Sequence, residues 1–223
     1  MKYLKSILLL LILSTPAMAQ VKLGVTAGLN INVFTFAEQD FKDYVDKARP
    51  GLVIGPTAIF TVPKTGLGAD ISALFDMRSA KLNIPSGKET RSETIHSNAI
   101  QFPVNLRYGI TFGDMVYGFI STGPQFGVSL SEKEKTLAHK TGDHNLELRW
   151  VNNSSTFCWN FGIGGVVMDK VQVRVNFSLA LKNTGELQQV DVTPDVPEET
   201  LVPTKVLTSG KAHACQVMVS YLF

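Results

Sequence analysis

The chain has 223 residues, of which 44% are hydrophobic and 18% charged, and its formal net charge is +2 at pH 7. This balance lacks the basic surplus of a nucleic-acid-binding protein, and two cysteines are too few for a disulfide scaffold or a cysteine metal site. The length suits a single all-β domain.

Residues 1–19 have the features of a secretory signal peptide. Lys2 and Lys5 precede an apolar run over 7–13, and Ala17-Met18-Ala19 forms an A-x-A site. The run is too short to cross a bilayer as a helix. We expect cleavage after Ala19, export of the protein, and one mature domain over 20–223. Loss of the two lysines leaves 19 basic and 19 acidic residues, so the mature chain is neutral.

The first mature segment, residues 21–34, alternates between apolar and polar or small side chains. Such a period of two predicts a strand with one apolar face. The same pattern recurs in seven further segments. They are 52–62, 67–78, 98–112, 116–130, 155–168, 171–182 and 211–223. In 116–130, Tyr117 and Phe119 are out of phase, and a β-bulge would restore the alternation.

The connections between these segments are short and long in strict turn. The short ones are 63–66, 113–115 and 169–170, and the long ones are 34–50, 79–97, 131–154 and 183–210. An up-and-down sheet has this property when all short turns lie at one end. Eight strands then place both termini at the short-turn end, and closure into a barrel leaves no unpaired edge.

The alternation alone fits two kinds of barrel, a soluble one with an apolar interior and a membrane one with an apolar exterior. The composition of the polar face favours the membrane barrel, because a water-facing wall should be rich in Lys and Glu. The face instead carries mostly small and amide side chains. They include Thr26, Asn30, Asn32, Ser72, Gln101, Asn105, Gln125, Asn160, Gln172 and Asn176.

We therefore predict an all-β fold, an eight-stranded antiparallel up-and-down transmembrane β-barrel in the outer membrane of a Gram-negative bacterium. Each strand reaches the 9–11 residues that a tilted membrane strand needs. The apolar face contacts lipid and the polar face fills the lumen.

Seven charged residues share the lumen-facing phase. They are Lys22, Asp70, Asp76, Arg78, Arg107, Arg174 and Lys182. Asp70 and Arg107 lie at similar heights on neighbouring predicted strands, so we expect an ion pair between them. Five bases face two acids, so other groups must balance the remaining charge. An interior of this width is filled by its own side chains, and we expect a closed lumen.

The last strand ends in an outward-facing row of Val217, Val219, Tyr221 and Phe223. This row resembles the terminal signal that the barrel-assembly machinery of bacterial outer membranes recognises. We therefore expect that machinery and outer-membrane lipid to be partners of the chain.

Three internal segments resemble the Bacteroidetes-type outer-membrane β-barrel domain, the PorT-like family. They are "AIQFPVNLRY" (99–108), "YGFISTGPQFGVSL" (117–130) and "FCWNFGIGGVVMDKVQVRVNFSLALKN" (157–183). The resemblance implies an eight-stranded barrel, and some members of the family are linked to protein secretion or gliding.

The sequence lacks the common hydrolase, zinc-protease and phosphate-loop motifs, and it indicates no cofactor. His139 and His144 lie near Asp143 in a long connection, where a solvated loop is a better interpretation than a metal site. His213 and Cys215 share the lipid-facing phase, as in some lipid-A-modifying barrels. A nucleophile needs a base with an orienting acid, and the adjacent rows offer none, so we expect no enzyme.

The long connections are the best candidates for function, because a rigid scaffold presents binding segments on its loops. Phe41, Tyr44 and Val45 have helical spacing and could form a short rim helix or a disordered tip. Residues 183–210 carry five acids, including Asp191, Asp195, Glu198 and Glu199, against one base. They could bind Ca²⁺ or a basic partner, or be merely solvated. The expected function is a structural or interaction scaffold, with a secretion accessory, a narrow channel and a lipid-A-modifying enzyme as alternatives.

Overall fold

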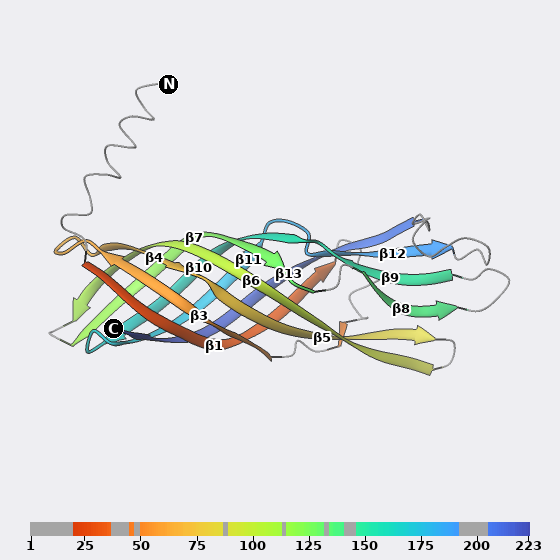
Figure 1. Cartoon of the computed structure of the whole chain (residues 1–223), viewed down its shortest axis with the longest axis horizontal. Coiled ribbons are helices and arrows are strands. Elements are labelled where there is room, and N and C mark those ends of the chain that lie inside the picture. The colour runs from red at the N-terminus through yellow and green to blue at the C-terminus, as the bar shows by residue number, and fades with distance from the viewer. Residues whose placement is uncertain are drawn as a thin grey trace, which may run out of the picture.

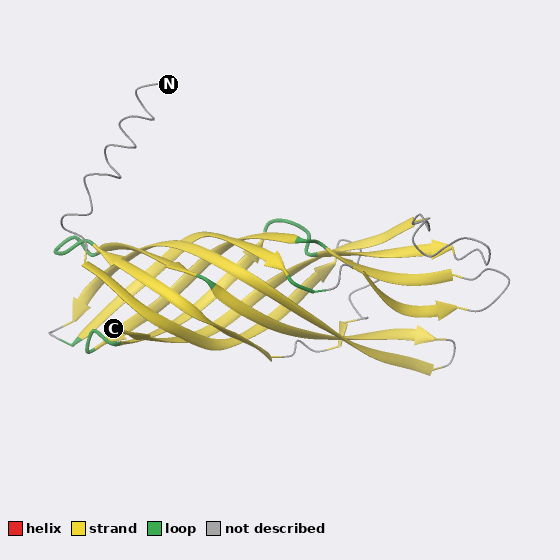
Figure 2. Cartoon of the chain, viewed as in Figure 1, coloured by secondary structure: helices red, strands yellow, loops and turns green. Residues whose placement is uncertain are grey.

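The computed structural model describes residues 20–36, 45–46, 50–86, 89–112, 115–131, 134–140, 146–191 and 205–223. Every regular element in these ranges is a strand (Figures 1 and 2). No helix among them is long and apolar enough to cross a membrane. The predicted signal peptide, residues 1–19, lies outside the described ranges.

Antiparallel strands close into an eight-membered ring. In order they are β1 (Gln20–Phe36), β3 (Pro50–Thr61), β4 (Leu67–Ser72) continued by β5 (Leu74–Ser86), β6 (Glu89–Phe112), β7 (Val116–Ser129), β10 (Ser155–Val167), β11 (Val171–Ala180) and β13 (Lys205–Leu222). Each pairs with the next, and β13 closes the ring on β1. The predicted all-β, eight-stranded antiparallel barrel is confirmed.

The pairing register determines the tilt of the strands. A path that steps through paired residues leaves β6 at Gly109 and returns to it at Ala99, a displacement of ten residues. The intermediate partners are Phe119, Gly164, Arg174, Met218, Gly28, Val53 and Asp76. For eight strands about 4.8 Å apart, this displacement gives a tilt of about 40° and a radius of about 8 Å. An interior of that radius holds side chains and little else.

Burial shows which face of the wall points inward. Residues of β11 alternate between exposed and buried from Val171 to Ala180. On β6, Leu106 is 70% exposed whereas its neighbour Arg107 is 2% exposed. The apolar face lies outside and the polar face inside, so the soluble barrel with an apolar interior is excluded.

The third wall strand is divided into β4 and β5 at Ala73, opposite Pro56 of β3. The amide of Ala73 donates to the carbonyl oxygen of Pro56 at 3.0 Å. Pro56 has no N–H to donate in return, so the ladder lacks one hydrogen bond at this point. The pairing keeps the same register on both sides of the gap.

The bulge expected in the 116–130 strand is absent. The pairing of β7 with β6 and with β10 keeps one register along its length. Phe119 is instead an inward-facing residue, 3% exposed, and Tyr117 is half-buried beside it. Their phase differs from that of the apolar wall because they belong to the lumen.

The tight connections lie at one end of the barrel, here named the turn end. It includes residues 62–66 and 168–170, together with the start of β1 and the end of β13 (Figure 1). The amide of Leu222 donates to the carbonyl of Lys170 at 2.7 Å, and that of Phe223 donates to Leu23 at 2.7 Å. The predicted placement of the strand termini at this end is thus observed.

At the opposite end, here named the loop end, several predicted loops contain strands. The additional elements are β2 (Val45–Asp46), β8 (Glu134–Lys140), β9 (Leu146–Asn152) and β12 (Gly185–Asp191). β5 and β6 stay paired out to Ser86 and Glu89, and β12 joins β9 to β13. These hairpins extend past the barrel in Figure 1. The apolar alternation could not predict these strands. A strand that pairs in water has no side that faces lipid, so it needs no alternating row of apolar residues.

Candidate functional site

Asp76 of β5 is completely buried in the lumen near the loop end. Arg78 donates its Nε to Oδ2 at 2.7 Å, and Gln101 donates its Nε2 to the same oxygen at 2.5 Å. Asn30 of β1 donates to the other oxygen, Oδ1. The carboxylate therefore has a neutralising partner and hydrogen bonds to both oxygens, as a buried charge requires.

Asp70 of β4 forms a second buried ion pair, which spans the lumen. Its Oδ1 lies 2.7 Å from Nη1 of Arg174 on β11, and both side chains are nearly inaccessible. β4 and β11 are four strands apart in a ring of eight, so the pair joins opposite walls. Asn105 donates to the same Oδ1 at 2.9 Å.

The expected pair between Asp70 and Arg107 is wrong. In the register of β4 and β6, Asn105 lies opposite Asp70, and Arg107 lies opposite Gly68. Arg107 is therefore two residues, about 7 Å, closer to the turn end. Arg174 pairs with Asp70 from the opposite wall. Neither proximity in the sequence nor the register of neighbouring strands predicts a contact across the lumen.

Amide side chains connect the two carboxylates in a continuous chain of hydrogen bonds. From Asp76 the chain runs through Gln101, Gln125, Asn160 and Asn105 to Asp70, with successive distances of 2.5, 2.5, 3.1, 3.3 and 2.9 Å. We call these six residues, with Arg78 and Arg174, the lumen network. It connects groups from five wall strands and runs from Asp76 near the loop end to Asp70 in the middle of the barrel.

Arg107 lies between the lumen network and the turn end. Its guanidinium carbon is 3.7 Å from the centroid of the Phe119 ring and 5.3 Å from that of Tyr117. Its Nη1 donates to Oε1 of Gln172 at 3.0 Å. In the described part of the chain, Arg107 has no carboxylate partner.

The lumen also contains two apolar clusters that the polar-face analysis did not predict. Their members are Ile59, Phe119, Val166 and Leu222 near the turn end, and Val53, Leu74 and Met218 farther inside. Inward-facing glycines leave room for the large members. A Cβ on Gly164 would lie 2.7 Å from the Phe119 ring, and one on Gly28 would lie 2.8 Å from Met218. The sequence feature that could have predicted these clusters was the out-of-phase position of Tyr117 and Phe119 in β7.

Two of the seven predicted lumen charges lie at the ends of the barrel. Lys22 is at the turn end, where its Nζ is 2.8 Å from Oδ1 of Asp169. Lys182 is exposed at the loop end and donates to Oγ of Ser155 at 3.2 Å. β11 ends at Ala180, so the inward phase no longer applies to Lys182.

The outward-facing pair near the loop end lacks the contacts of a catalytic site. Cys215 is exposed on the lipid side. His213 accepts a hydrogen bond at Nδ1 from the amide of Ala180 at 3.1 Å and stacks on Phe177. This hydrogen bond joins β11 to β13 at the point where their backbone pairing ends. Among the described residues, no acid bonds to His213.

The terminal row of β13 faces outward along its whole length. Val217, Val219, Tyr221 and Phe223 are 50, 49, 51 and 78% exposed. The rings of Tyr221 and Phe223 pack edge to face, with centroids 5.6 Å apart. The row therefore lies on the outer surface of the wall.

Most of the loop candidates fall outside the described ranges, including Phe41, Tyr44, Asp143, His144, Asp195, Glu198 and Glu199. Val45 is part of the short strand β2 and not of a helix. His139 lies in β8 and Asp191 in β12. Across the described ranges, no group of three or more His, Cys, Asp or Glu side chains could hold a metal ion.

A match to a family model agrees with this architecture. Residues 16–185 match the family model described as "Outer membrane protein beta-barrel domain". The chain is similar to the solved outer membrane protein OprG from Pseudomonas aeruginosa, with 10% identity, a TM-score of 0.44, and coverage of 92% of this chain and 95% of that one. No curated protein sequence matches the chain.

Proposed function

Because the chain belongs to the outer membrane protein β-barrel domain family and lies in the outer membrane, we propose that it serves there as a non-enzymatic scaffold. Its function resides in the segments beyond the loop end, which present a binding surface to a protein partner. Outer-membrane barrels direct their short turns to the periplasm and their long connections to the outside. The loop-end hairpins then face the cell exterior.

The observation that supports this proposal is the division of the molecule into a filled barrel and extended hairpins. The lumen network and the two apolar clusters occupy the interior. The pairing of β5 with β6, of β8 with β9 and of β12 with β13 continues past the wall. A rigid base that presents long segments is the usual arrangement of a binding scaffold.

A secretion-accessory role, as in some PorT-like proteins, is the second candidate. It is favoured by the three internal segments over 99–130 and 157–183 that resemble that family, all within the span that the family model matches. In this role the hairpins would bind a component of a secretion apparatus. The two candidates therefore share a surface and differ in the partner.

A hairpin-shortened variant tests the proposal. Replacing residues 134–152 by a short Asn-Gly turn removes β8 and β9 and leaves the wall strands intact. The variant should still migrate as a heat-modifiable barrel on a detergent gel but should lose the adducts that the parent chain forms with a surface-restricted cross-linker on intact cells. The matched control is Lys182→Gln, which keeps all the loop-end hairpins.

Persistence of all adducts in the shortened variant would contradict the scaffold proposal. A fall in the amount of secreted protein in the same variant would favour the accessory role over a purely structural one.

A further inference from the structure

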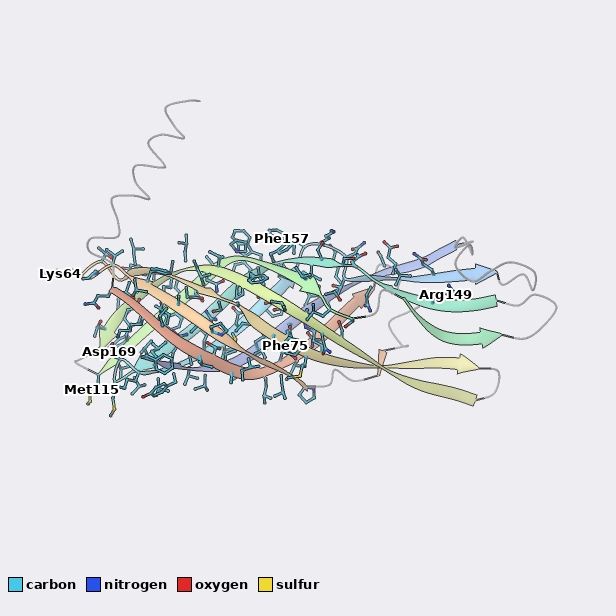
Figure 3. The ribbon with its side chains drawn as sticks, in the orientation of Figure 1. Lys64, Phe75, Met115, Arg149, Phe157 and Asp169 are labelled. Atoms are coloured by element: carbon cyan, nitrogen blue, oxygen red, sulfur yellow. The ribbon has the colours of Figure 1, made fainter. Side chains whose placement is uncertain are left out.

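The turn end contains a cavity of about 610 Å³. It lies between the 62–66 connection and the adjoining ends of β6, β7, β10 and β13. Figure 3 places Lys64, Met115 and Asp169 at this end of the barrel, all of which line the cavity. Short turns of outer-membrane barrels face the periplasm, so the cavity opens to that compartment. It is separate from the loop-end surface of the scaffold.

The cavity is positively charged. Among the described residues, its lining contains the bases Lys22, Lys64 and Arg107 and a single acid, Asp169. Asp169 is already paired with Lys22 at 2.8 Å. Lys64 and Arg107 are therefore left without an acidic partner in the lining.

Arg107 provides an independent indication of a missing anion. It is 2% exposed, and its Nε has no hydrogen-bond partner among the described residues. Within the described ranges, three buried or half-buried arginines lie in the lumen, of which Arg78 and Arg174 are paired with the two aspartates. A buried charge without a counter-ion is strongly unfavourable, so Arg107 favours a site occupied by an anion.

The remaining lining combines polar groups with apolar side chains. Ile59, Val166 and Leu222 close the cavity toward the lumen and are already buried. Tyr117, whose hydroxyl donates to the carbonyl of Gly66 at 3.1 Å, is half-buried, and Val62 and Pro63 are also partly open to the cavity. An inorganic ion alone would leave these surfaces uncovered. A ligand with a short hydrocarbon body would bury them.

We propose that this turn-end cavity binds a small organic anion, a carboxylate or phosphate group on a short apolar body. The anionic group lies toward Arg107 and Lys64, and the apolar body covers the partly open side chains of Val62, Pro63 and Tyr117. A guanidinium suits both head groups, because its planar set of donors matches carboxylate and phosphate oxygens. The site takes its ligand from the periplasm.

Nuclear magnetic resonance on the full chain, folded in a nonionic detergent, tests the proposal. The resonances to follow are the Arg107 Nε–H and the amides of Gly66 and Gly109, which line the cavity. Hexanoate and hexyl phosphate are the anionic probes, and neutral hexanamide and inorganic phosphate are the controls. We expect saturable shifts with at least one anionic probe, and the stronger of the two identifies the head group.

Two substitutions should weaken the binding of that probe. Arg107→Gln should raise its Kd by about ten- to a hundredfold, the value expected for hydrogen bonds to a charged group. Lys64→Asn should raise it by a smaller factor; Lys64 has a φ of 66°, which Asn also tolerates, so this exposed variant should fold even if Arg107→Gln does not. Lys182→Gln at the loop end is the matched control and should leave Kd unchanged.

The proposal is overturned if neither anionic probe gives saturable shifts or if hexanamide binds as well as hexanoate. It is also overturned if neither substitution at the turn end changes Kd. Binding of inorganic phosphate as tight as that of hexyl phosphate would contradict the role of the apolar wall.

Discussion

At the scale of single residues, the lumen depends on charges that are neutralised by side chains from other strands. Asp70 is 1% exposed and Arg174 is 3% exposed, so removal of either partner leaves the other charge buried. Asp76 differs because Arg78, on the same strand, is its ionic partner. The pair that spans the lumen should therefore contribute more to closure of the barrel than the pair within one strand.

Asp70→Ala should lower the free energy of unfolding by about 3–5 kcal/mol, the range for breaking a buried ion pair. The double variant Asp70→Asn, Arg174→Gln removes both charges and keeps a polar amide at each position, so it should recover part of that loss. Urea-induced unfolding in detergent micelles measures both values. Equal stabilities for the parent chain and Asp70→Ala would contradict the proposed contribution of the pair.

The outward-facing pair gives a second prediction at this scale. His213→Ala removes the acceptor for the Ala180 amide and should slightly destabilise the wall, whereas Cys215→Ala should have little effect. Neither variant should change the lipid A species seen by mass spectrometry of the cells. Disappearance of a lipid A species in either variant would establish a lipid-modifying activity and replace the scaffold proposal.

At the scale of the elements, the sequence predicted the wall strands but not the contacts among them. Alternation identified each wall strand because lipid imposes an apolar side on every second residue. It could not identify β8, β9 or β12, on which lipid makes no such demand. It also gave Asp70 the wrong partner, since Arg174 is 104 residues away in the chain and meets it only after the ring has closed.

The turn between β10 and β11 contains two residues in the left-handed region. Met168 and Asp169 have φ values of 50° and 59°, the arrangement of a type I′ hairpin. Methionine is poorly suited to this region, whereas asparagine is common there. Met168→Asn should therefore stabilise the barrel by up to about 1 kcal/mol.

Thermal unfolding in micelles, followed by circular dichroism, measures this gain. Lys170→Asn changes a neighbouring position outside the left-handed region and serves as the control. A lower midpoint temperature for Met168→Asn than for the control would contradict the role assigned to the backbone.

The last strand gives a further prediction for an element. Deletion of Phe223 removes the terminal aromatic of the outward row and the hydrogen bond from its amide to Leu23. The yield of assembled, heat-modifiable barrel in the membrane fraction should then fall. Shortening the connection around Pro197 should lower that yield less. The reverse order of the two yields would show that this row does not serve assembly.

At the scale of the whole molecule, the number of strands and their register determine both the closure of the barrel and the width of the interior that side chains fill. Eight strands with a displacement of ten residues give a radius of about 8 Å, which side chains can fill. The lumen network and the apolar clusters are the material that fills it. The family places this filled barrel in the outer membrane, and the anion cavity at its turn end does not extend through it.

Single-channel recording in a planar bilayer tests the central claim most directly. A lumen filled by the Asp70–Arg174 pair and the amide chain should give no stable conductance for the parent chain at any moderate voltage. The variant Asp70→Ala serves as a comparison, because loss of the ion pair would open the lumen and could not close it further. Reproducible, long-lived current steps from the parent chain would show that the lumen conducts ions and that the protein is a channel.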